Sequence, residues 1–512
     1  MIDWTALAVF VVLFGFVTVL GFAAANWQRG DLEELHEWAL AGRRFSTLVT
    51  WFLLGGDIYT AYTFVALPAL AFGVGAPAFF ALPYTTIVFP LAFVIAPRLW
   101  AIAKRRHYIT YADFARERYD SKSVEIIVAI TGIVATMLYI ALQLVGLQVV
   151  IRALGLSGPG LVGDLPVIIA FAILAMYTYR GGLRAPTLVA IVKDILIYVT
   201  VITAVIYIPW KLGGFAPIFA AANAALAALQ PKPGSIMLQP AGYFSYASLA
   251  LGSGFALLMY PHVMTGWLSS KDGDVLRRNM AILPAYSILL GIIALFGYMV
   301  IAAGLHPATP NDAVPTLFAH LFPSWFTGVA LAAIGIGALV PAAVMSIAAA
   351  NLYTRNIHRT LFGAATDPRQ ETSIAKTASL VVKIGALVAV LTLPAKFSIY
   401  YQLFAGALIL QTLPAVLFGL YTPWFHRRAL LAGWIVGMTV AIWMIVANKF
   451  ASVFPLHVVG TTYTGFIGLW SVLTNIVVCV ALTWIFDAAR VARGADKTTA
   501  ADYEDSGAPT TA

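Results

Sequence analysis

The chain has 512 residues, of which 61% are hydrophobic and 10% charged, with a formal net charge of +9. So few charged residues cannot cover the surface of a soluble domain, and the composition therefore indicates an all-α polytopic membrane protein. The single cysteine excludes an intramolecular disulfide and a cysteine-rich metal site. The basic residues lie in short loops between apolar segments, which argues against nucleic-acid binding.

Thirteen apolar stretches are long enough to cross a bilayer, at about 20 residues each. The first is predicted to be a retained helix rather than a signal peptide, because it lacks a preceding basic segment and a following small-residue cleavage site. No stretch outside the membrane is long enough for a catalytic or ATP-hydrolysing domain. In chain order the predicted spans are 4–26, 46–73, 76–103, 122–154, 163–180, 185–210, 244–268, 280–304, 318–354, 378–394, 398–421, 429–447 and 465–487.

The lysines and arginines between these spans set the predicted orientation. With the N-terminus outside the cell, 24 of the 31 Lys and Arg residues lie in cytoplasmic loops and five in outside loops. This asymmetry follows the positive-inside rule. The sequence therefore predicts an outside N-terminus, thirteen crossings and a cytoplasmic C-terminus. The tail over 488–512 is polar and rich in small residues, and it is predicted to be disordered.

The stretch Leu54–Thr60 lies inside the second predicted span and contains Gly55, Gly56 and Asp57. Adjacent glycines favour an interruption of a helix, and a carboxylate at membrane depth marks a functional site by default. Broken helices of this kind form the binding sites of many secondary transporters. The alternative is a glycine-rich packing notch with Asp57 close to the membrane surface.

Four short motifs occur in order along the chain, and together they resemble the sodium:solute symporter family over about residues 30 to 450. They are Leu40-Ala41-Gly42-Arg43-Arg44, Ile109-Thr110-Tyr111-Ala112-Asp113-Phe114, Tyr177-Thr178-Tyr179-Arg180-Gly181-Gly182 and Ala342-Ala343-Val344-Met345-Ser346. Two further strings resemble the bacterial monocarboxylate permease branch of that family. They are Arg180-Gly181-Gly182-Leu183-Arg184-Ala185-Pro186 and Tyr260-Pro261-His262-Val263-Met264.

The resemblance implies a fold of two inverted five-helix repeats, each with a broken first helix. Gly55-Gly56 is predicted to break the first of these helices and Gly252-Ser253-Gly254 the second. The expected organisation is an N-terminal helix and first cytoplasmic loop (1–45), repeat 1 (46–210), an outer loop (211–243), repeat 2 (244–421), two further helices (422–487) and the tail (488–512).

A substrate carboxylate needs hydrogen-bond donors, and half-helix ends at a break expose free backbone N–H groups. Tyr59, Thr60 and Ser253 are therefore predicted to bind the substrate. The resemblance implies that Tyr139 and Gln143, one helical turn apart, also face the cavity. The alternative for these two side chains is an interhelical hydrogen bond.

The resemblance also implies a sodium site of carbonyl and hydroxyl oxygens, the ligands that hard cations prefer. The second hydroxyl position of the family is Ile347 here, which cannot coordinate an ion, and Ala190 replaces the family's usual aspartate. The remaining ligands carried over are the carbonyls of Gly55, Ile58 and Ala343 and the hydroxyl of Ser346.

Lys193 lies three residues after Ala190 on the same helical face. Some sodium-independent transporters of the wider superfamily place a lysine on the equivalent helix, with its ammonium in the sodium position. The resulting hypothesis is that Lys193 replaces sodium and that proton binding and release drive the cycle. The alternative is a lysine that snorkels to the cytoplasm.

Four other polar side chains lie within predicted spans, and the sequence predicts a role for each. Asp57 is assigned to ion coupling, and it can bind a proton, orient the break or pair with a cation. Asp194 is about 100° round the helix from Lys193, so the two are expected not to pair. Lys383 is expected to snorkel from near the cytoplasmic start of its helix. His262 is expected to be a structural hydrogen-bonding residue.

The sequence thus predicts a secondary active transporter of the bacterial inner membrane that imports short-chain monocarboxylates of the lactate, pyruvate, acetate or propionate type. The expected coupling ion is a proton or, alternatively, sodium, with no other cofactor. The expected partners are the carboxylate and the lipid bilayer, without nucleic acid, and the functional unit is a monomer. The alternatives are a sodium-coupled symporter of another small solute, such as proline or pantothenate, and a membrane sensor on the same fold. No spacing of an enzyme active site is present.

Overall fold

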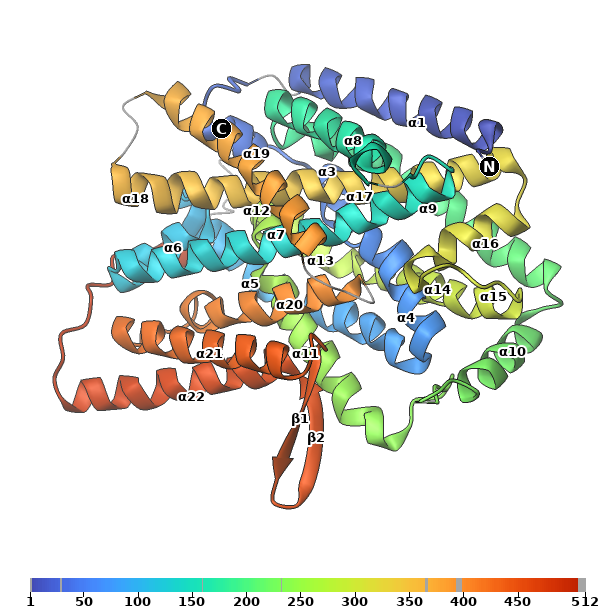
Figure 1. Ribbon diagram of the computed structural model, residues 1–512. Coiled ribbons are helices and arrows are strands. Elements are labelled where there is room, and N and C mark those ends of the chain that lie inside the picture. Colours follow the sequence, from blue (N-terminus) through green and yellow to red (C-terminus); the bar gives the residue numbers. More distant parts are fainter. Residues whose placement is uncertain are drawn as a thin grey trace.

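The computed structural model describes residues 2–27, 30–158, 160–231, 233–363, 367–392 and 398–504. Helices make up most of this part of the chain, and its one two-stranded sheet is a hairpin. The long helices run side by side, with α18 and α6 at one end of the bundle and α10 and α16 at the other (Figure 1).

The helices of the first half follow the predicted spans closely, with a break inside the span at 46–73. Short 3₁₀ or π segments are η1 (Ala24–Asn26), η2 (Ala41–Arg43), η3 (Tyr62–Ala66) and η4 (Ala76–Phe80). The α-helices are α1 (Trp4–Ala23), α2 (Leu35–Leu40), α3 (Thr47–Gly56), α4 (Leu67–Val74), α5 (Ala81–Arg105), α6 (Tyr111–Tyr119), α7 (Lys122–Ala153), α8 (Gly160–Gly181), α9 (Arg184–Lys211) and α10 (Phe215–Ala227).

The second half contains more short helices. Its 3₁₀ or π segments are η5 (Pro240–Gly242), η6 (Pro310–Asp312), η7 (Tyr353–His358), η8 (Leu410–Thr412), η9 (Pro414–Phe418) and η10 (Ala500–Tyr503). Its α-helices are α11 (Tyr243–Met259), α12 (Pro261–Leu268), α13 (Gly273–Ile282), α14 (Pro284–Ala294), α15 (Phe296–Ala302), α16 (Ala313–Leu321), α17 (Ser324–Leu352), α18 (Arg359–Phe362), α19 (Pro368–Thr392), α20 (Ile399–Ile409), α21 (Arg427–Ala447) and α22 (Ile467–Ala488).

Ten helical segments of the described chain are long and apolar enough to cross a membrane. This confirms an all-α polytopic membrane architecture. Of the other predicted spans, 46–73 is interrupted by a turn, 398–421 contains 3₁₀ and π segments, and 163–180 is described only in part. The number of thirteen crossings therefore stays a prediction.

Helix α17 forms the centre of the bundle. It packs against α1, α7, α9 and α19, and 94% of its most apolar stretch is buried. Its sequence is rich in Ala and contains three Gly residues, and such small side chains let helix backbones approach closely in a membrane. The ion motif around Ser346 therefore lies in the core, between α9 and α19.

The first predicted break is confirmed. Helix α3 ends at Gly56, the chain turns through Asp57–Thr60, and helical structure resumes through η3 into α4. Glycine is the poorest helix former apart from proline, so the Gly55-Gly56 pair weakens the helix where the turn follows. The turn leaves backbone carbonyls of this segment free to accept hydrogen bonds from other elements.

The second predicted break is in the wrong place. Helix α11 runs without interruption through Gly252-Ser253-Gly254, and the chain breaks at Tyr260, whose ψ of 134° is extended. Pro261 explains the position, because proline lacks an N–H group and forces the preceding residue out of helical geometry. Gly252 instead makes room for Phe466, whose ring would overlap with a Cβ there.

Two features were not predicted from the sequence. Helix α19 begins at Pro368, ten residues before the predicted span at 378. Strands β1 (Val453–Val458) and β2 (Thr461–Phe466) form an antiparallel hairpin between α21 and α22. Its turn residues Val459 and Gly460 both have positive φ, as two-residue hairpin turns require.

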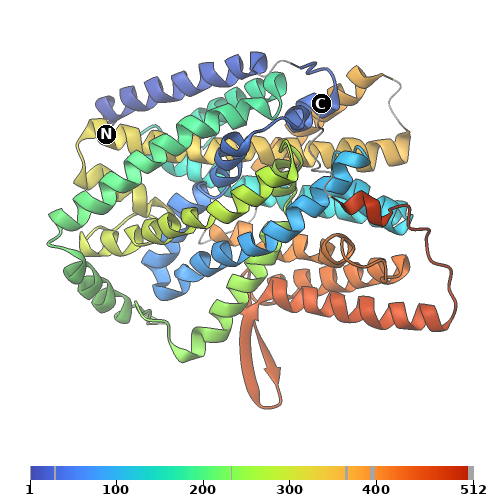
Figure 2. The same ribbon diagram turned by 180° about the vertical axis from the view of Figure 1, so that it is seen from behind.

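The prediction of a disordered tail is wrong for residues 489–504, while 505–512 lie outside the described residues. Figure 2 shows this segment leaving α22 and lying beside α5 and α6. Arg106 pairs with Asp502 at 2.6 Å, Arg118 with Asp496 at 2.6 Å, and Lys497 with Asp120 at 2.8 Å. These pairs join the tail to the charged residues of α6 and its flanking loops. The composition of the tail alone does not reveal that its charges complement those of this region.

Candidate ion and substrate site

The ammonium of Lys193, on α9, lies against the broken segment after α3. Its Nζ donates to the carbonyl of Gly56 at 2.5 Å and to the carbonyl of Tyr59 at 3.1 Å. The side chain is fully buried. Lys193 therefore does not snorkel, and it supplies a positive charge at the place where the helix break presents carbonyl oxygens.

The two glycines of the break are required by their neighbours. A Cβ on Gly56 would lie 3.0 Å from Lys193 Nζ, so a side chain there would push the ammonium away. A Cβ on Gly55 would overlap with the ring of Tyr286, on α14. The pair thus lets a lysine from the first half and a tyrosine from the second half reach the same turn.

Asp194 pairs with Lys193, contrary to the expectation from helical geometry. The Asp194 Oδ1 to Lys193 Nζ distance is 3.1 Å, and both side chains are fully buried. Tyr286 Oη donates to Asp194 Oδ2 at 3.0 Å, and Tyr59 Oη donates to the Tyr286 carbonyl at 3.1 Å. The flexible four-carbon stem of lysine spans the angle between the two residues, and Tyr286 holds the carboxylate in place.

The sodium ligands carried over from the family are hydrogen-bonded locally. The Gly55 carbonyl accepts from the backbone N–H of Ile58 at 2.9 Å, and the Ile58 carbonyl accepts from Thr63 Oγ1. Ser346 Oγ donates to the Ala343 carbonyl at 2.8 Å. The carbonyls that Lys193 contacts, Gly56 and Tyr59, are each one residue further along the chain than the pair predicted for sodium.

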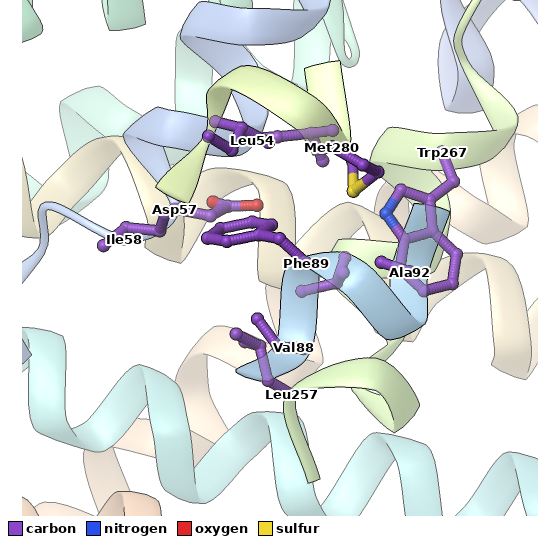
Figure 3. A pocket seen from close by; sticks show the side chains of 11 residues that line it. Leu54, Asp57, Ile58, Val88, Phe89, Ala92, Leu257, Trp267 and Met280 are labelled. Carbon is purple, nitrogen blue, oxygen red and sulfur yellow. The ribbon is translucent and has the colours of Figure 1, made fainter. Parts of the chain in front are cut away.

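Asp57 lies at the end of α3 beside an apolar pocket. Figure 3 shows its carboxylate between Leu54 and Phe89, with Met280 and Trp267 further along the wall. The side chain is 6% exposed, and its Oδ2 has no hydrogen-bond partner among the residues described. An unpaired buried carboxylate is costly, so this oxygen is positioned for a proton or an incoming ligand.

A second group of buried polar atoms surrounds the breaks. Gln143 Oε1 accepts from the backbone N–H of Ala61 at 3.1 Å, which ties α7 to the first break. Its Nε2 and Ser253 Oγ have no hydrogen-bond partner in the described part of the chain, and the buried Tyr62 lies beside Tyr84. Hydroxyl and amide N–H groups of this kind are suitable donors for a carboxylate.

Three aromatic rings pack together at the second break. The ring of Tyr139 lies 5.1 Å from that of Tyr260 and 5.5 Å from that of His262. His262 is fully buried, and neither ring nitrogen has a hydrogen-bond partner within the described residues. The expected structural hydrogen bond of His262 is therefore not formed.

The remaining predicted substrate residues, Thr60 and Tyr59, make contacts within or beside the first break. Thr60 Oγ1 accepts from the backbone N–H of Tyr62 at 3.0 Å, and the Tyr59 ring centroid lies 4.6 Å from that of Tyr286. Sequence reasoning missed Tyr286 and Tyr62. A tyrosine in an apolar helix carries no local signal of its partner, and only packing assigns Tyr286 to Asp194, 92 residues away.

Comparison with known proteins identifies the family. The model of the sodium:solute symporter family matches residues 38–437. The chain belongs to the sodium:solute symporter family. A monocarboxylate transport permease protein of Rhizobium johnstonii is 50% identical over 494 residues, covering 95% of this chain and 98% of that protein. An uncharacterized symporter of Bacillus subtilis, YodF, is 31% identical, covering 94% of each chain.

Among solved structures, a substrate-bound, outward-open Na⁺-coupled sialic acid symporter matches with a TM-score of 0.74 at 15% identity, covering 96% of this chain and 99% of that one. This match shows the shared fold. The family and the relatives show that the protein is a multi-pass membrane transporter of small solutes, not an enzyme.

Proposed function

We propose that this symporter imports short-chain monocarboxylates by alternating access, coupled to protons, with the ammonium of Lys193 in the position that sodium occupies in the family. The observation that carries the proposal is the pair of hydrogen bonds from Lys193 Nζ to the carbonyls of Gly56 and Tyr59 at the helix break. The monocarboxylate permease of Rhizobium johnstonii, 50% identical, supports the substrate class.

An ammonium carries the same charge as Na⁺ and binds the same carbonyl oxygens through its N–H groups. Asp194 at 3.1 Å supplies the counter-charge, so the protonated pair is neutral. The side chains of Ile347 and Ala190 offer no oxygen to a metal ion. A proton arriving at or leaving Lys193 then makes or removes the cation at the break, which is the step that sodium binding performs in a sodium symporter.

The proposed hydrogen-bond donors to the substrate carboxylate are buried side chains around the two helix breaks. Gln143 Nε2 and Ser253 Oγ are buried and unpaired in the described residues, the Tyr62 hydroxyl is buried beside the first break, and Tyr139 is proposed to face the same cavity. Because these donors are neutral, they bind an anion without adding a fixed charge. A proton that stays on Asp57 removes the repulsion between that carboxylate and an incoming anionic substrate, so Asp57 supports coupling without carrying a transported proton.

The proposed location is the bacterial inner membrane, with the N-terminus outside and the C-terminus in the cytoplasm, as the asymmetry of Lys and Arg residues favours. The tail then docks against α6 and the basic end of α5 on the cytoplasmic face. The proposed functional unit is a monomer in the lipid bilayer.

The test is uptake of radiolabelled lactate into proteoliposomes under an imposed pH gradient, with sodium replaced by choline. We expect accumulation that follows the pH gradient and is unchanged by the replacement. Uptake that collapses without sodium would refute proton coupling. A purified transporter that accumulates proline or pantothenate with sodium, and not lactate, would establish the sodium-coupled alternative.

A further inference from the structure

A second lysine is buried within the membrane-spanning bundle. Lys383 lies on α19, and its side chain is 3% exposed. Its Nζ is hydrogen-bonded to Ser379 on the same helix, inside the bundle, so the ammonium does not extend to the surface. The expectation that Lys383 snorkels is therefore wrong.

The Lys383 ammonium begins a chain of hydrogen bonds that ends at the ion motif of α17. Lys383 Nζ donates to Ser379 Oγ at 2.8 Å, and Ser379 Oγ donates to Ser346 Oγ at 3.1 Å. Ser346 Oγ in turn donates to the Ala343 carbonyl at 2.8 Å. Ser346 and Ala343 are two of the sodium ligands implied by the family motif, so Lys383 is connected to that motif through a single hydroxyl.

The direction of this chain depends on the protonation of Lys383. An ammonium has three donors and no acceptor, so Ser379 must accept from Lys383 and pass its own hydrogen to Ser346. A neutral amine can accept, which allows Ser379 to turn its hydrogen toward Lys383. Ser346 then loses its donor from α19. The charge on Lys383 thus determines how the Ser346 hydroxyl is engaged.

Lys383 differs from Lys193 in having no counter-charge. Among the described residues, no carboxylate lies within ion-pair distance of Lys383, whereas Lys193 has Asp194 at 3.1 Å. A buried ammonium without a counter-ion is costly. The charged form of Lys383 is therefore stabilised only by the carbonyl and hydroxyl of Ser379 among the described residues.

The elements packed against α19 are α7, α17, η7, α2 and α8. Helix α17 carries no ionisable side chain, and Met137 is the α7 residue that packs against Gly385 of α19. The ionisable side chains of η7, α2, α8 and α7 lie mostly at the ends of these elements, and most of them have partners at those ends. They are Tyr353, Arg355 and His358 on η7, with Arg355 paired to Glu371; His36 and Glu37 on α2, with Glu37 paired to Arg44 and Arg184; Tyr177, Tyr179 and Arg180 on α8, with Lys376 over Tyr179; and Lys122, Glu125, Tyr139 and Arg152 on α7.

We propose that Lys383 is a second proton-binding site of the transport cycle, and that the Ser379–Ser346 bridge communicates its protonation to the ion motif of α17. The inference rests on the proposed proton-coupled transport and adds a stoichiometry to it. One proton is carried on Lys193 and one on Lys383 for each carboxylate. Both are taken from water on the outside and released as protons to water on the cytoplasmic side.

The test is the limit of lactate accumulation in proteoliposomes with the membrane potential clamped at zero. One pH unit corresponds to a tenfold ratio for each coupled proton, so a one-unit gradient supports accumulation of up to about 100-fold with two protons and about tenfold with one. We expect the wild-type protein to approach the higher limit and Lys383→Met to approach the lower one. Lys376→Met, on the same helix and half-buried, is the matched control and should behave as wild type.

Ser379→Ala retains the lysine and removes the bridge, so it should also lower the limit toward tenfold, and it keeps the test decisive if Lys383→Met does not fold. A wild-type limit near tenfold, or Lys383→Met and Ser379→Ala limits equal to wild type, would overturn the inference while leaving proton-coupled transport intact. A wild-type protein that ignores the pH gradient would instead refute the proposed function itself.

Discussion

Replacing Lys193 by methionine removes the ammonium from the helix break while keeping a long, unbranched side chain. The change leaves the carbonyls of Gly56 and Tyr59 without their donor and leaves Asp194, fully buried, without its counter-charge. Removing one partner of a buried ion pair destabilises a protein by about 3–5 kcal/mol. We expect a loss of this size for Lys193→Met.

The double variant Lys193→Met with Asp194→Asn separates the charge from the packing. It removes both charges together, and replacing both partners of a buried pair by neutral groups is often close to neutral. The asparagine introduced by the second substitution would still offer an amide oxygen to the Tyr286 hydroxyl. The double variant is therefore expected to recover more than half of the stability lost by the single one.

The response of the Lys193→Met variant to sodium also tests whether the ammonium occupies the sodium position. In Lys193→Met the Gly56 carbonyl, the Tyr59 carbonyl and the Asp194 carboxylate remain as three oxygens around a vacated position, which are ligands for a hard cation. Sodium at about 100 times its dissociation constant would stabilise the variant by about 2.7 kcal/mol. The assay is thermal unfolding of the purified protein in sodium chloride and in choline chloride.

We expect sodium to raise the melting temperature of Lys193→Met and to leave that of the wild-type protein unchanged. A wild-type protein that is stabilised by sodium as strongly as the variant would refute the reasoning, because the ammonium then would not occupy the sodium position. A single variant as stable as wild type in choline would also contradict it.

Three further predictions concern the surroundings of the site and the tail. Tyr286→Phe removes the donor to the Asp194 carboxylate and should cost about 1.5–3 kcal/mol, measured by thermal unfolding; a neutral effect would show that this bond contributes nothing. Gly55→Ala places a Cβ against the Tyr286 ring and should cost about 1–3 kcal/mol and reduce uptake, and full uptake would contradict the required close approach. The hydrogen bond from Arg106 lowers the pKa of Asp502 to about 2, so docking of the tail should be constant above about pH 4, the ordinary aspartate pKa, and weaken as the pH falls toward 2. Limited proteolysis of the tail measures this, and unchanged cleavage across that range would contradict the role of the ion pair.

Much of the molecule follows from local features of the sequence. Composition determines the membrane environment, because too few polar residues are present to face water. The pair Gly55-Gly56 correctly predicts a break at the end of α3, because glycine acts on the backbone of its own segment. The family motifs bring Lys193 to the correct helix face, and its contacts with the break agree with that placement.

Tertiary structure decides what depends on distant partners. Asp194 is adjacent to Lys193 in sequence, yet its pairing depends on a flexible lysine stem and on Tyr286 from the second half of the chain. The second break occurs at Tyr260, before Pro261, and not at Gly252, which makes room for the ring of Phe466 instead. Lys383 is buried because α19 packs against α7 and α17, where Ser379 receives its ammonium.

The same distinction explains the ion site. The residue types at the break, on α9 and on α17 are readable from the sequence because each belongs to a short motif. Which carbonyls receive the ammonium, and which hydroxyl of α19 engages Ser346, depends on how these helices pack at distances of about 3 Å. A shift of one residue in backbone position exchanges one carbonyl for the next, and no local sequence signal is that specific.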